Sequence, residues 1–121
     1  MGTLIGKTAA NKTARYREIV KQLLEQYVPI RYANGEIENE AVFDADHDRY
    51  LVVSVGWQGY HRVEHNLIHL DIIDGKIWIQ KDGTEDGIAD ELEAAGVPKS
   101  DIVLAFQPLE NRILIPDYAV S

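Results

Sequence analysis

The amino-acid sequence predicts an α+β fold: a two-layer sandwich in which an N-terminal helix and a second helix cover one face of a four-stranded antiparallel meander, with a short C-terminal strand and tail. Two observations support this prediction. Apolar residues recur at helical spacing in two segments, residues 16–27 and 88–95. Between them lie four alternating runs joined by short turns, which indicates antiparallel neighbours, because parallel strands need long crossovers.

The first helix is predicted from an apolar stripe that has a polar face opposite it. Thr13 is the expected N-cap, and Pro29 is expected to end the helix before a turn at Asn34-Gly35. The stripe follows the i, i+3, i+4 pattern of an amphipathic helix and consists of Tyr16, Ile19, Val20, Leu23, Leu24 and Tyr27.

The length of the chain bounds its domain organisation. A chain of 121 residues fits one domain and can bury enough surface to fold without disulfides. Residues 1–12 are small and polar and show no periodicity, so we expect them to form a mobile N-terminal tail. Residues 13–121 are then expected to form the single domain.

The middle of the chain alternates between polar and apolar residues in a way that is typical of strands. Turn signals divide this region, and the last of them is Asp74-Gly75, where glycine takes a positive φ without steric cost. The four predicted strands are residues 36–44, 49–57, 61–73 and 76–80.

A second helix and a short strand are predicted after the meander. Thr84 stands where an N-cap is expected, and apolar residues at helical spacing follow it. Gly96 is expected to end the helix in a left-handed conformation, and Pro98 prevents its continuation. Residues 102–106 are expected to form a short, mostly buried strand.

The composition excludes several classes of chemistry. The chain has no cysteine, which excludes disulfides, thiolate metal ligands and cysteine nucleophiles. No apolar run approaches the roughly 20 residues of a membrane span. The N-terminal residues also lack the apolar centre of a signal peptide. We therefore expect a cytoplasmic protein without membrane contact.

The net charge of −8 is unevenly distributed. Residues 1–31 hold six Lys or Arg and two Glu, a charge of +4, while residues 32–121 hold six basic and eighteen acidic residues, a charge of −12. An acidic body disfavours broad contact with DNA phosphates, whose binding depends on Lys and Arg, and it favours basic partners. The plainer interpretation is that the surplus carboxylates keep a small domain soluble.

Three histidines, His61, His65 and His69, raise the question of a metal site. In an extended strand, residues four apart lie about 13 Å from each other. Two of these histidines therefore cannot share one zinc ion, whose ligands lie about 2 Å from it. One of them could still join the turn at residues 46–48, but histidines on a polar, partly exposed sheet face are the favoured interpretation.

No other motif indicates an active site. The serines lack the context of a nucleophile, and no phosphate-binding loop is present. We therefore predict no catalytic, cofactor-binding or metal-binding residue. Carboxylates do cluster around the second helix, but the helix dipole and solvent exposure account for them better than acid–base chemistry: Asp82, Glu85, Asp86, Asp90, Glu91 and Glu93.

Trp78 is the side chain most indicative of a binding surface. The isoleucines on either side of it are expected to face the helices, which places Trp78 on the open side of the sheet. The same placement is expected of Tyr50 and His69. An aromatic side chain on an open sheet face often marks a protein interface. The alternative is that Trp78 packs beneath the C-terminal tail, residues 108–121.

A series of motifs in the second half of the chain, with a few earlier residues, carries a family resemblance. The motifs are DGKIWIQ at residues 74–80, DGTE at 82–85, GIA at 87–89 and GVP at 96–98; the earlier residues are Tyr16-Arg17, Phe43-Asp44, Val55-Gly56-Trp57 and Arg62. Over about residues 14–121 the chain resembles the XisI family, the fdxN element excision controlling factors of cyanobacteria. It departs from the family at residues 107–109, where Gln-Pro-Leu replaces a His-Pro-Pro-like run.

The resemblance implies an accessory protein in programmed DNA rearrangement. In that setting a site-specific recombinase excises an element that interrupts nitrogen-fixation genes during heterocyst differentiation. The family acts beside a second small factor, the nuclease-like XisH, and the two control the recombinase. The resemblance transfers no catalytic residue to this chain. Relatives far from any such element leave an antitoxin-like or other regulatory partnership as the alternative.

The first functional hypothesis is therefore a non-enzymatic protein that binds an XisH-like partner and, through it, a recombinase complex, so that contact with DNA is indirect. The acidic body and the aromatic on the open sheet face motivate it. A homodimer through a sheet edge or face is also compatible with the sequence. The candidate partner contacts are Trp78, Gln80, Asp82 and Glu85.

Two other functions are considered. Direct DNA binding would use the basic first helix, with Arg15, Arg17 and Lys21 on phosphates. A metal-dependent hydrolase would use one of three histidines with nearby aspartates, and it ranks last: His47, His65 and His69.

Overall fold

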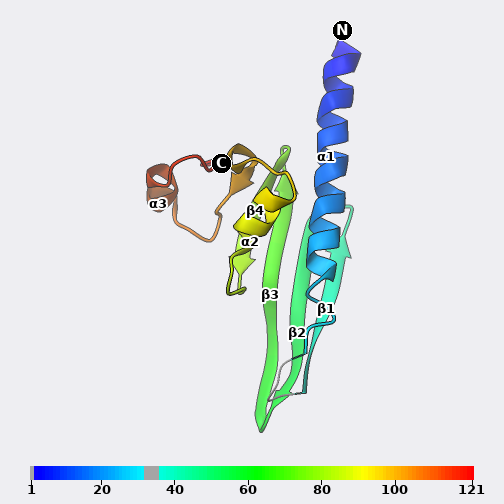
Figure 1. Cartoon of the computed structure of the whole chain (residues 1–121), viewed down its shortest axis with the longest axis vertical. Coiled ribbons are helices and arrows are strands. Elements are labelled where there is room, and N and C mark those ends of the chain that lie inside the picture. The colour runs from blue at the N-terminus through cyan, green and yellow to red at the C-terminus, as the bar shows by residue number, and fades with distance from the viewer. Residues whose placement is uncertain (1, 32–35) are drawn as a thin grey trace.

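The computed structural model describes the backbone of residues 2–31 and 36–121 and the side chains of residues 11–31 and 36–121. It confirms the predicted α+β class and the layer of helices on a sheet, and Figure 1 shows α1 and α2 on one side of the strands. In chain order the elements are α1 (Gly2–Glu25), β1 (Glu36–Asp44), β2 (Arg49–Gln58), β3 (His61–Ile73), β4 (Lys76–Asp82), α2 (Ile88–Ala94), the 3-10 helix η1 (Lys99–Asp101), β5 (Ile102–Val103) and α3 (Leu109–Leu114).

The sheet has the strand order β1-β2-β3-β4-β5. Its first four strands form the predicted antiparallel meander. β5 pairs with β4 in parallel, because α2 and η1 carry the chain back across the sheet before β5 begins. The last strand is shorter than the predicted residues 102–106: it ends at Val103, and Phe106 only donates one backbone hydrogen bond to Ile79, of 3.1 Å.

The first helix is longer than predicted. Because α1 begins at Gly2, residues 2–12 are helical and Thr13 is not an N-cap, while the mobility expected of this segment stays a prediction. In Figure 1 the first turns of α1 project beyond the sheet. The helix ends at Glu25, before Pro29, and the predicted Asn34-Gly35 turn lies outside the described residues. The division of the chain into a domain that begins at residue 13 stays a prediction.

The hydrophobic core lies between the helices and the sheet. The stripe predicted for the first helix faces this core, where Ile19 and Tyr27 are partly buried and its other members are buried. α1 contacts β1, β2, β3 and α2, and a fully buried Leu or Ile contributes roughly 1.5–3 kcal/mol to stability. The core side chains that are less than 2% exposed include Tyr16, Val20, Leu24, Tyr50, Val52, Leu70, Ile79, Ile88 and Leu92.

Two buried polar residues explain why β1 interrupts its apolar pattern at Asn39. Asn39 lies directly opposite Ser54 in the β1–β2 register. The Ser54 hydroxyl donates to Asn39 Oδ1 at 2.7 Å, and Asn39 Nδ2 donates to the carbonyl of Tyr27 at 2.8 Å. A buried polar group costs little when it is hydrogen-bonded, so this contact joins the end of α1 to the sheet without loss of stability.

The predicted cap of the second helix is wrong in position and in residue. α2 begins at Ile88, and its backbone N–H donates to Asp82 Oδ2 at 2.8 Å. The other oxygen of Asp82 accepts from Thr84 N at 2.9 Å and from Thr84 Oγ1 at 2.5 Å. Thr84 therefore helps to hold Asp82, which supplies the acceptor. The helix does end as predicted, since Gly96 has a φ of 103°.

A bulge changes which β3 side chains share a face. Strict alternation places His65 and His69 on the same side, but the register between β2 and β3 shifts at Val52/Val53. His65 then lies opposite Ser54 on the helix side, whereas His69 lies opposite Leu51 on the open side. Tyr50 was also expected on the open side, and this is wrong: it is 1% exposed and belongs to the core.

The β2–β3 hairpin reaches past the helices. Figure 1 shows both strands continuing beyond the ends of α1 and α2. Trp57, near the turn, is 47% exposed and Tyr60 in the turn is fully exposed. In the described part of the chain, no helix is long and apolar enough to cross a membrane.

Four tyrosine hydroxyls join the elements by donating to carboxylates. Tyr16 and Tyr27 of α1 donate to Asp101 and Glu91, which ties the helix to η1 and α2. The full set is Tyr16 with Asp101, Tyr27 with Glu91, Tyr50 with Asp48, and Tyr118 with Glu93.

Candidate functional site

The face of the sheet opposite α1 and α2 is called the open face. Its side chains alternate along β2 with the buried Tyr50 and Val52, and residues paired in the register share a face. Along β2 it presents an apolar row, which is half-buried except at Trp57, the member nearest the hairpin turn. Its members include Glu36, Glu38, Glu40 and Val42 of β1, Leu51, Val53, Val55 and Trp57 of β2, Arg62, Glu64, His69 and Asp71 of β3, and Trp78 of β4.

Trp78 lies on the open face, as predicted, but the C-terminal segment partly covers it. The guanidinium carbon of Arg112 in α3 lies 5.9 Å from the centroid of the Trp78 ring, within range of a cation–π contact. Trp78 also lines a pocket of about 240 Å³ with Lys76 and Ser121. The alternative interpretation, in which the tail packs over Trp78, is therefore correct for part of the side chain. The indole is only partly exposed on the open face.

Beside Trp78, three polar side chains form a cluster on the open face. His69 Nε2 lies 2.8 Å from Asp71 Oδ1, and Gln80 Nε2 donates to Asp71 Oδ2 at 3.3 Å. Asp71 is 8% exposed and lies directly opposite Trp78 in the β3–β4 register. A carboxylate orients an imidazole in this way in many acid–base sites. However, Ser54 of the neighbouring strand β2 lies on the other face of the sheet, so it is not placed as a nucleophile beside His69. The cluster thus offers fixed hydrogen-bonding groups rather than a nucleophile and its base.

The four predicted partner contacts do not form one surface. Trp78 and Gln80 lie together on the open face. Asp82 uses both carboxylate oxygens to hold the start of α2. Glu85 is exposed and lines a separate pocket of about 360 Å³ beside Tyr27, at the end of α1. Their roles as contacts stay predictions, and the structure divides them into two pairs.

Four exposed apolar side chains near the C-terminus form a surface that the sequence analysis missed, called the C-terminal patch. Phe106, Leu109, Ile113 and Leu114 are 48%, 51%, 64% and 80% exposed. Leu109 and Ile113 are four residues apart in α3 and so share one side of this helix, and neighbouring exposed apolar side chains mark interaction sites more often than isolated ones do. The available signal was Leu109 and Ile113 at i, i+4, in a segment interpreted only as a tail.

The cations predicted to contact DNA are already engaged. Arg17 donates to Asp48 through Nε and Nη2 at 2.8 and 3.0 Å. Lys21 pairs with Glu18 at 3.1 Å, and the Arg15 guanidinium carbon lies 5.3 Å from the centroid of the Tyr16 ring. DNA contact through these residues stays a prediction, and the contact with Asp48 already uses Nε and Nη2 of the Arg17 guanidinium.

Asp48→Asn is expected to test the contact between α1 and the β1–β2 turn. The hydrogen bond from Arg17, then that from Tyr50, lowers the pKa of Asp48. Asparagine keeps the shape and tolerates the φ of 51° at this position, but it loses the charge. We expect the free energy of unfolding to fall by about 1 kcal/mol at neutral pH.

The sign of the pH dependence follows from the lowered pKa. The stability that Asp48 contributes is present above the unfolded pKa of about 3.9 and is lost as the pH falls through the lower folded value. The difference between the native protein and Asp48→Asn should therefore shrink in urea unfolding as the pH falls below the unfolded pKa. A constant difference across this range would contradict the role of the Asp48 charge.

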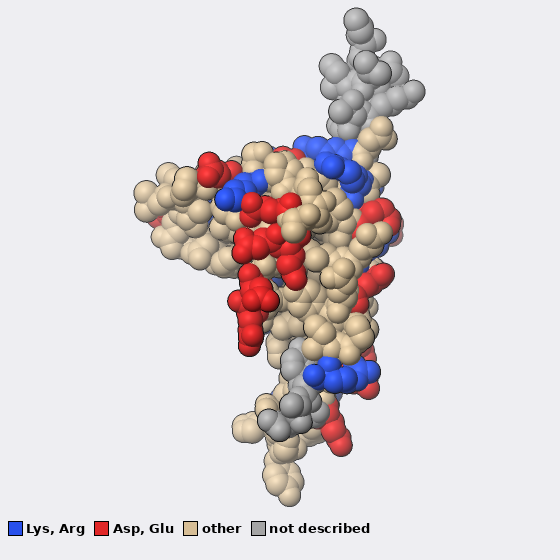
Figure 2. Space-filling model, in the orientation of Figure 1, with Lys and Arg blue, Asp and Glu red and all other residues tan. Residues whose placement is uncertain are grey.

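Acidic side chains dominate the helix side of the molecule, and Figure 2 shows Asp and Glu gathered over α2. Among the described residues, no group of three or more His, Asp or Glu side chains is arranged to hold a metal ion. The histidines of the hydrolase hypothesis are separated, because His65 and His69 lie on opposite faces and His47 contacts only Asp44 at 2.7 Å. The structure thus brings no metal site together in its described part.

Comparisons with known proteins agree with the fold. The family model described as XisI protein matches residues 10–120. A crystal structure of a XisI-like protein from Anabaena variabilis is 39% identical, with a TM-score of 0.81 over 89% of this chain and 98% of that one. The fdxN element excision controlling factor XisI from the same species is 32% identical, with a TM-score of 0.76 over 91% and 99%. No curated protein matches. Since the family match spans nearly the whole chain, the protein belongs to the XisI family.

Proposed function

We propose that the protein is a non-enzymatic controlling factor for the excision of a DNA element and that it acts by binding an XisH-like protein, which connects it to a site-specific recombinase. A related structure is described as an fdxN element excision controlling factor, and this supports the role in excision control. Action through a partner protein, rather than on DNA directly, is supported by the paired cations of α1 and by the acidic surface over α2.

The observation that carries the proposal is the C-terminal patch. Four large apolar side chains stay in solvent, although Arg112, in the same helix as three of them, lies over Trp78. Interfaces commonly place apolar side chains at the centre and polar groups at the rim. The polar cluster lies on the same face as Trp78, and its partly exposed members His69 and Gln80, held by the buried Asp71, are suited to the rim.

Co-expression with the XisH-like protein of the same genome tests the proposal. We expect the two proteins to co-purify on an affinity tag and to co-elute from size-exclusion chromatography at low salt, with less complex at high salt because acidic surfaces contribute. If no complex forms at either salt concentration, the partner named here is wrong. A complex with a different nuclease-like protein would favour the antitoxin-like alternative.

The double variant Ile113→Asp, Leu114→Asp is expected to abolish this co-purification. Both side chains are at least 64% exposed, so the fold should be retained, whereas two carboxylates buried at the interface would weaken binding by at least about a hundredfold. The control is Tyr60→Asp, which places one such carboxylate at a fully exposed position in the β2–β3 turn. Equal loss in the control, or none in the double variant, would show that the C-terminal patch is not the interface.

A further inference from the structure

β1 forms a free edge of the sheet. Within the described chain its only strand neighbour is β2, and it is nine residues long. The edge of a sheet presents a row of unpaired backbone N–H and C=O groups, which can serve as a template for another strand. Such edges accept extended peptides in several classes of binding protein.

This edge lacks most of the features that prevent strand addition. Proteins usually protect an edge with proline, lysine, a bulge or a very short strand. Residues 36–44 contain neither proline nor lysine. The register with β2 runs without a shift from Glu36↔Trp57 to Asp44↔Arg49. Negative charge is therefore the one protective feature that this edge has.

The negative charges along β1 disfavour pairing with a second copy of the chain and favour a strand of positive charge. Glu36, Glu38 and Glu40 alternate along β1 and are exposed, and no Lys or Arg in the described residues forms an ion pair with them. If two copies paired antiparallel about Glu40, it would face its own copy and Glu36 would face Asp44. Like charges directly opposite are destabilising, so the edge repels a second copy and attracts a strand of opposite charge.

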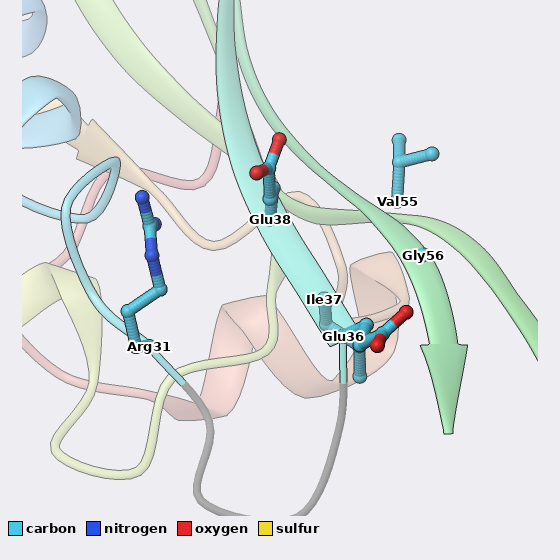
Figure 3. A pocket seen from close by; sticks show the side chains of 6 residues that line it. All are labelled: Arg31, Glu36, Ile37, Glu38, Val55 and Gly56. Carbon is cyan, nitrogen blue, oxygen red and sulfur yellow. The ribbon is translucent and has the colours of Figure 1, made fainter. Parts of the chain in front are cut away.

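A pocket opens beside the same edge. It has a volume of about 480 Å³ and is lined by Arg31, Glu36, Ile37, Glu38, Val55 and Gly56. Figure 3 shows Glu38 extending from β1 on the side of Val55, with Arg31 on a separate segment across from the strand. Because Glu38 lies between the free edge and Val55 in the β1–β2 register, a basic side chain on an added strand would meet Glu38 directly across the edge.

We propose that β1 accepts an extended segment of a partner protein that carries Lys or Arg at every second position and adds as a further strand. Backbone hydrogen bonds along the edge supply affinity, and the alternating cations meet the glutamates and fix the register. The inference rests on the proposed function, since it assumes that the protein acts by binding another protein. It adds a second surface, separate from the C-terminal patch, and the chemistry of the segment that binds there.

A synthetic nine-residue peptide of alternating Lys and Val tests this inference with the full chain. We expect saturable binding by fluorescence anisotropy, weakened by salt, and none by the same peptide with Glu in place of Lys. The decisive probe is the Lys-Val peptide with N-methyl groups on alternate residues, which keeps its charge but cannot complete the strand hydrogen bonds. Its binding should be lost. Equal binding of both basic peptides would overturn strand addition. The glutamates would then only protect the edge against pairing with other strands.

Variants of the edge complete the test. Glu38→Lys with Glu40→Lys should weaken peptide binding by at least about tenfold, because both positions become repulsive. The control, Glu64→Lys, reverses a single exposed glutamate of the open face that lies on β3 rather than on the edge strand, and it should leave binding unchanged. Equal effects of the double variant and the control would overturn the inference.

The test separates this inference from the proposed function. Partner capture without any peptide binding would overturn the edge site alone. Peptide binding without partner capture would support the edge site and contradict the proposal of an XisH-like partner.

Discussion

Raising the pH from 10 to 12 is expected to unfold the protein. Burial, followed by the hydrogen bond to a carboxylate, raises the pKa of Tyr16, Tyr50 and Tyr118 to about 12 and also raises that of Tyr27. The stability from these protonated hydroxyls is fully present below the unfolded pKa of about 10 and is lost as the pH rises through the folded values. Each pKa unit corresponds to about 1.4 kcal/mol, so the combined loss is comparable to the whole stability of a small domain.

The measurement is urea unfolding, followed by circular dichroism, at several values of pH. In Tyr16→Phe one titrating hydroxyl is absent. Above pH 10 the slope of the unfolding free energy against pH should therefore be less steep than in the native protein, by about 1.4 kcal/mol per pH unit. The control Tyr60→Phe removes a fully exposed hydroxyl and should leave the slope unchanged. Identical slopes in Tyr16→Phe and the native protein would mean that the contact with Asp101 does not depend on a protonated tyrosine.

Gly56→Ala is expected to destabilise the protein more than the replacement of a glycine in either hairpin turn, Gly59 or Gly75. Gly56 has a φ of 154°, and a Cβ atom there would lie 1.9 Å from the carbonyl oxygen of Glu36 and 2.8 Å from the Cα of Ile37. Both atoms are backbone, so β1 would have to move away from β2. We expect a loss of about 3 kcal/mol in the free energy of unfolding.

Gly59→Ala provides the matched control for this prediction. Gly59 also has a positive φ, of 62°, but no atom lies within 4 Å of the position of its Cβ. Its replacement should therefore cost only the backbone strain of about 1 kcal/mol. Chemical denaturation of the two variants separates the steric clash from the conformational preference, and equal losses would argue against the clash.

The parts of the fold that depend on local sequence were predictable. The turn at Asp74-Gly75 needs only two residues of the right conformation, and their φ values are 51° and 75°. The same holds for Gly96 at the end of α2, and for the long third strand, whose predicted bounds are confirmed at His61–Ile73. Each of these features is fixed by its own residues and their nearest neighbours.

Features that depend on distant contacts were not predictable in the same way. Asp82 caps α2 from six residues before the donor, whereas sequence rules place the acceptor within the first turn. The bulge opposite Val52/Val53 leaves no compositional signal, yet it changes the face of His69 relative to His65. Alternation alone therefore misassigned the histidines of β3 and could not decide the face of Tyr50.

The candidate site was predictable only in part. Trp78 was found because the isoleucines around it define the buried side of β4. The C-terminal patch was missed because α3 has only six residues, too few for a periodic signal, and because exposure depends on the fold as a whole. Arg112 could not be placed over Trp78 from the sequence, since the contact joins segments far apart in the chain.

The reach of the β2–β3 hairpin beyond the helices divides the sheet into two regions of unequal local stability. Within the described residues 55–66, no side chain is fully buried, whereas Val52, Ile68 and Leu70 on the same strands are 0% exposed. Cooperative opening needs only the local contacts to break, so the outer hairpin can open sub-globally while the helices stay docked. Amide exchange in the hairpin would then report this partial opening, and exchange in the inner strands would report global unfolding.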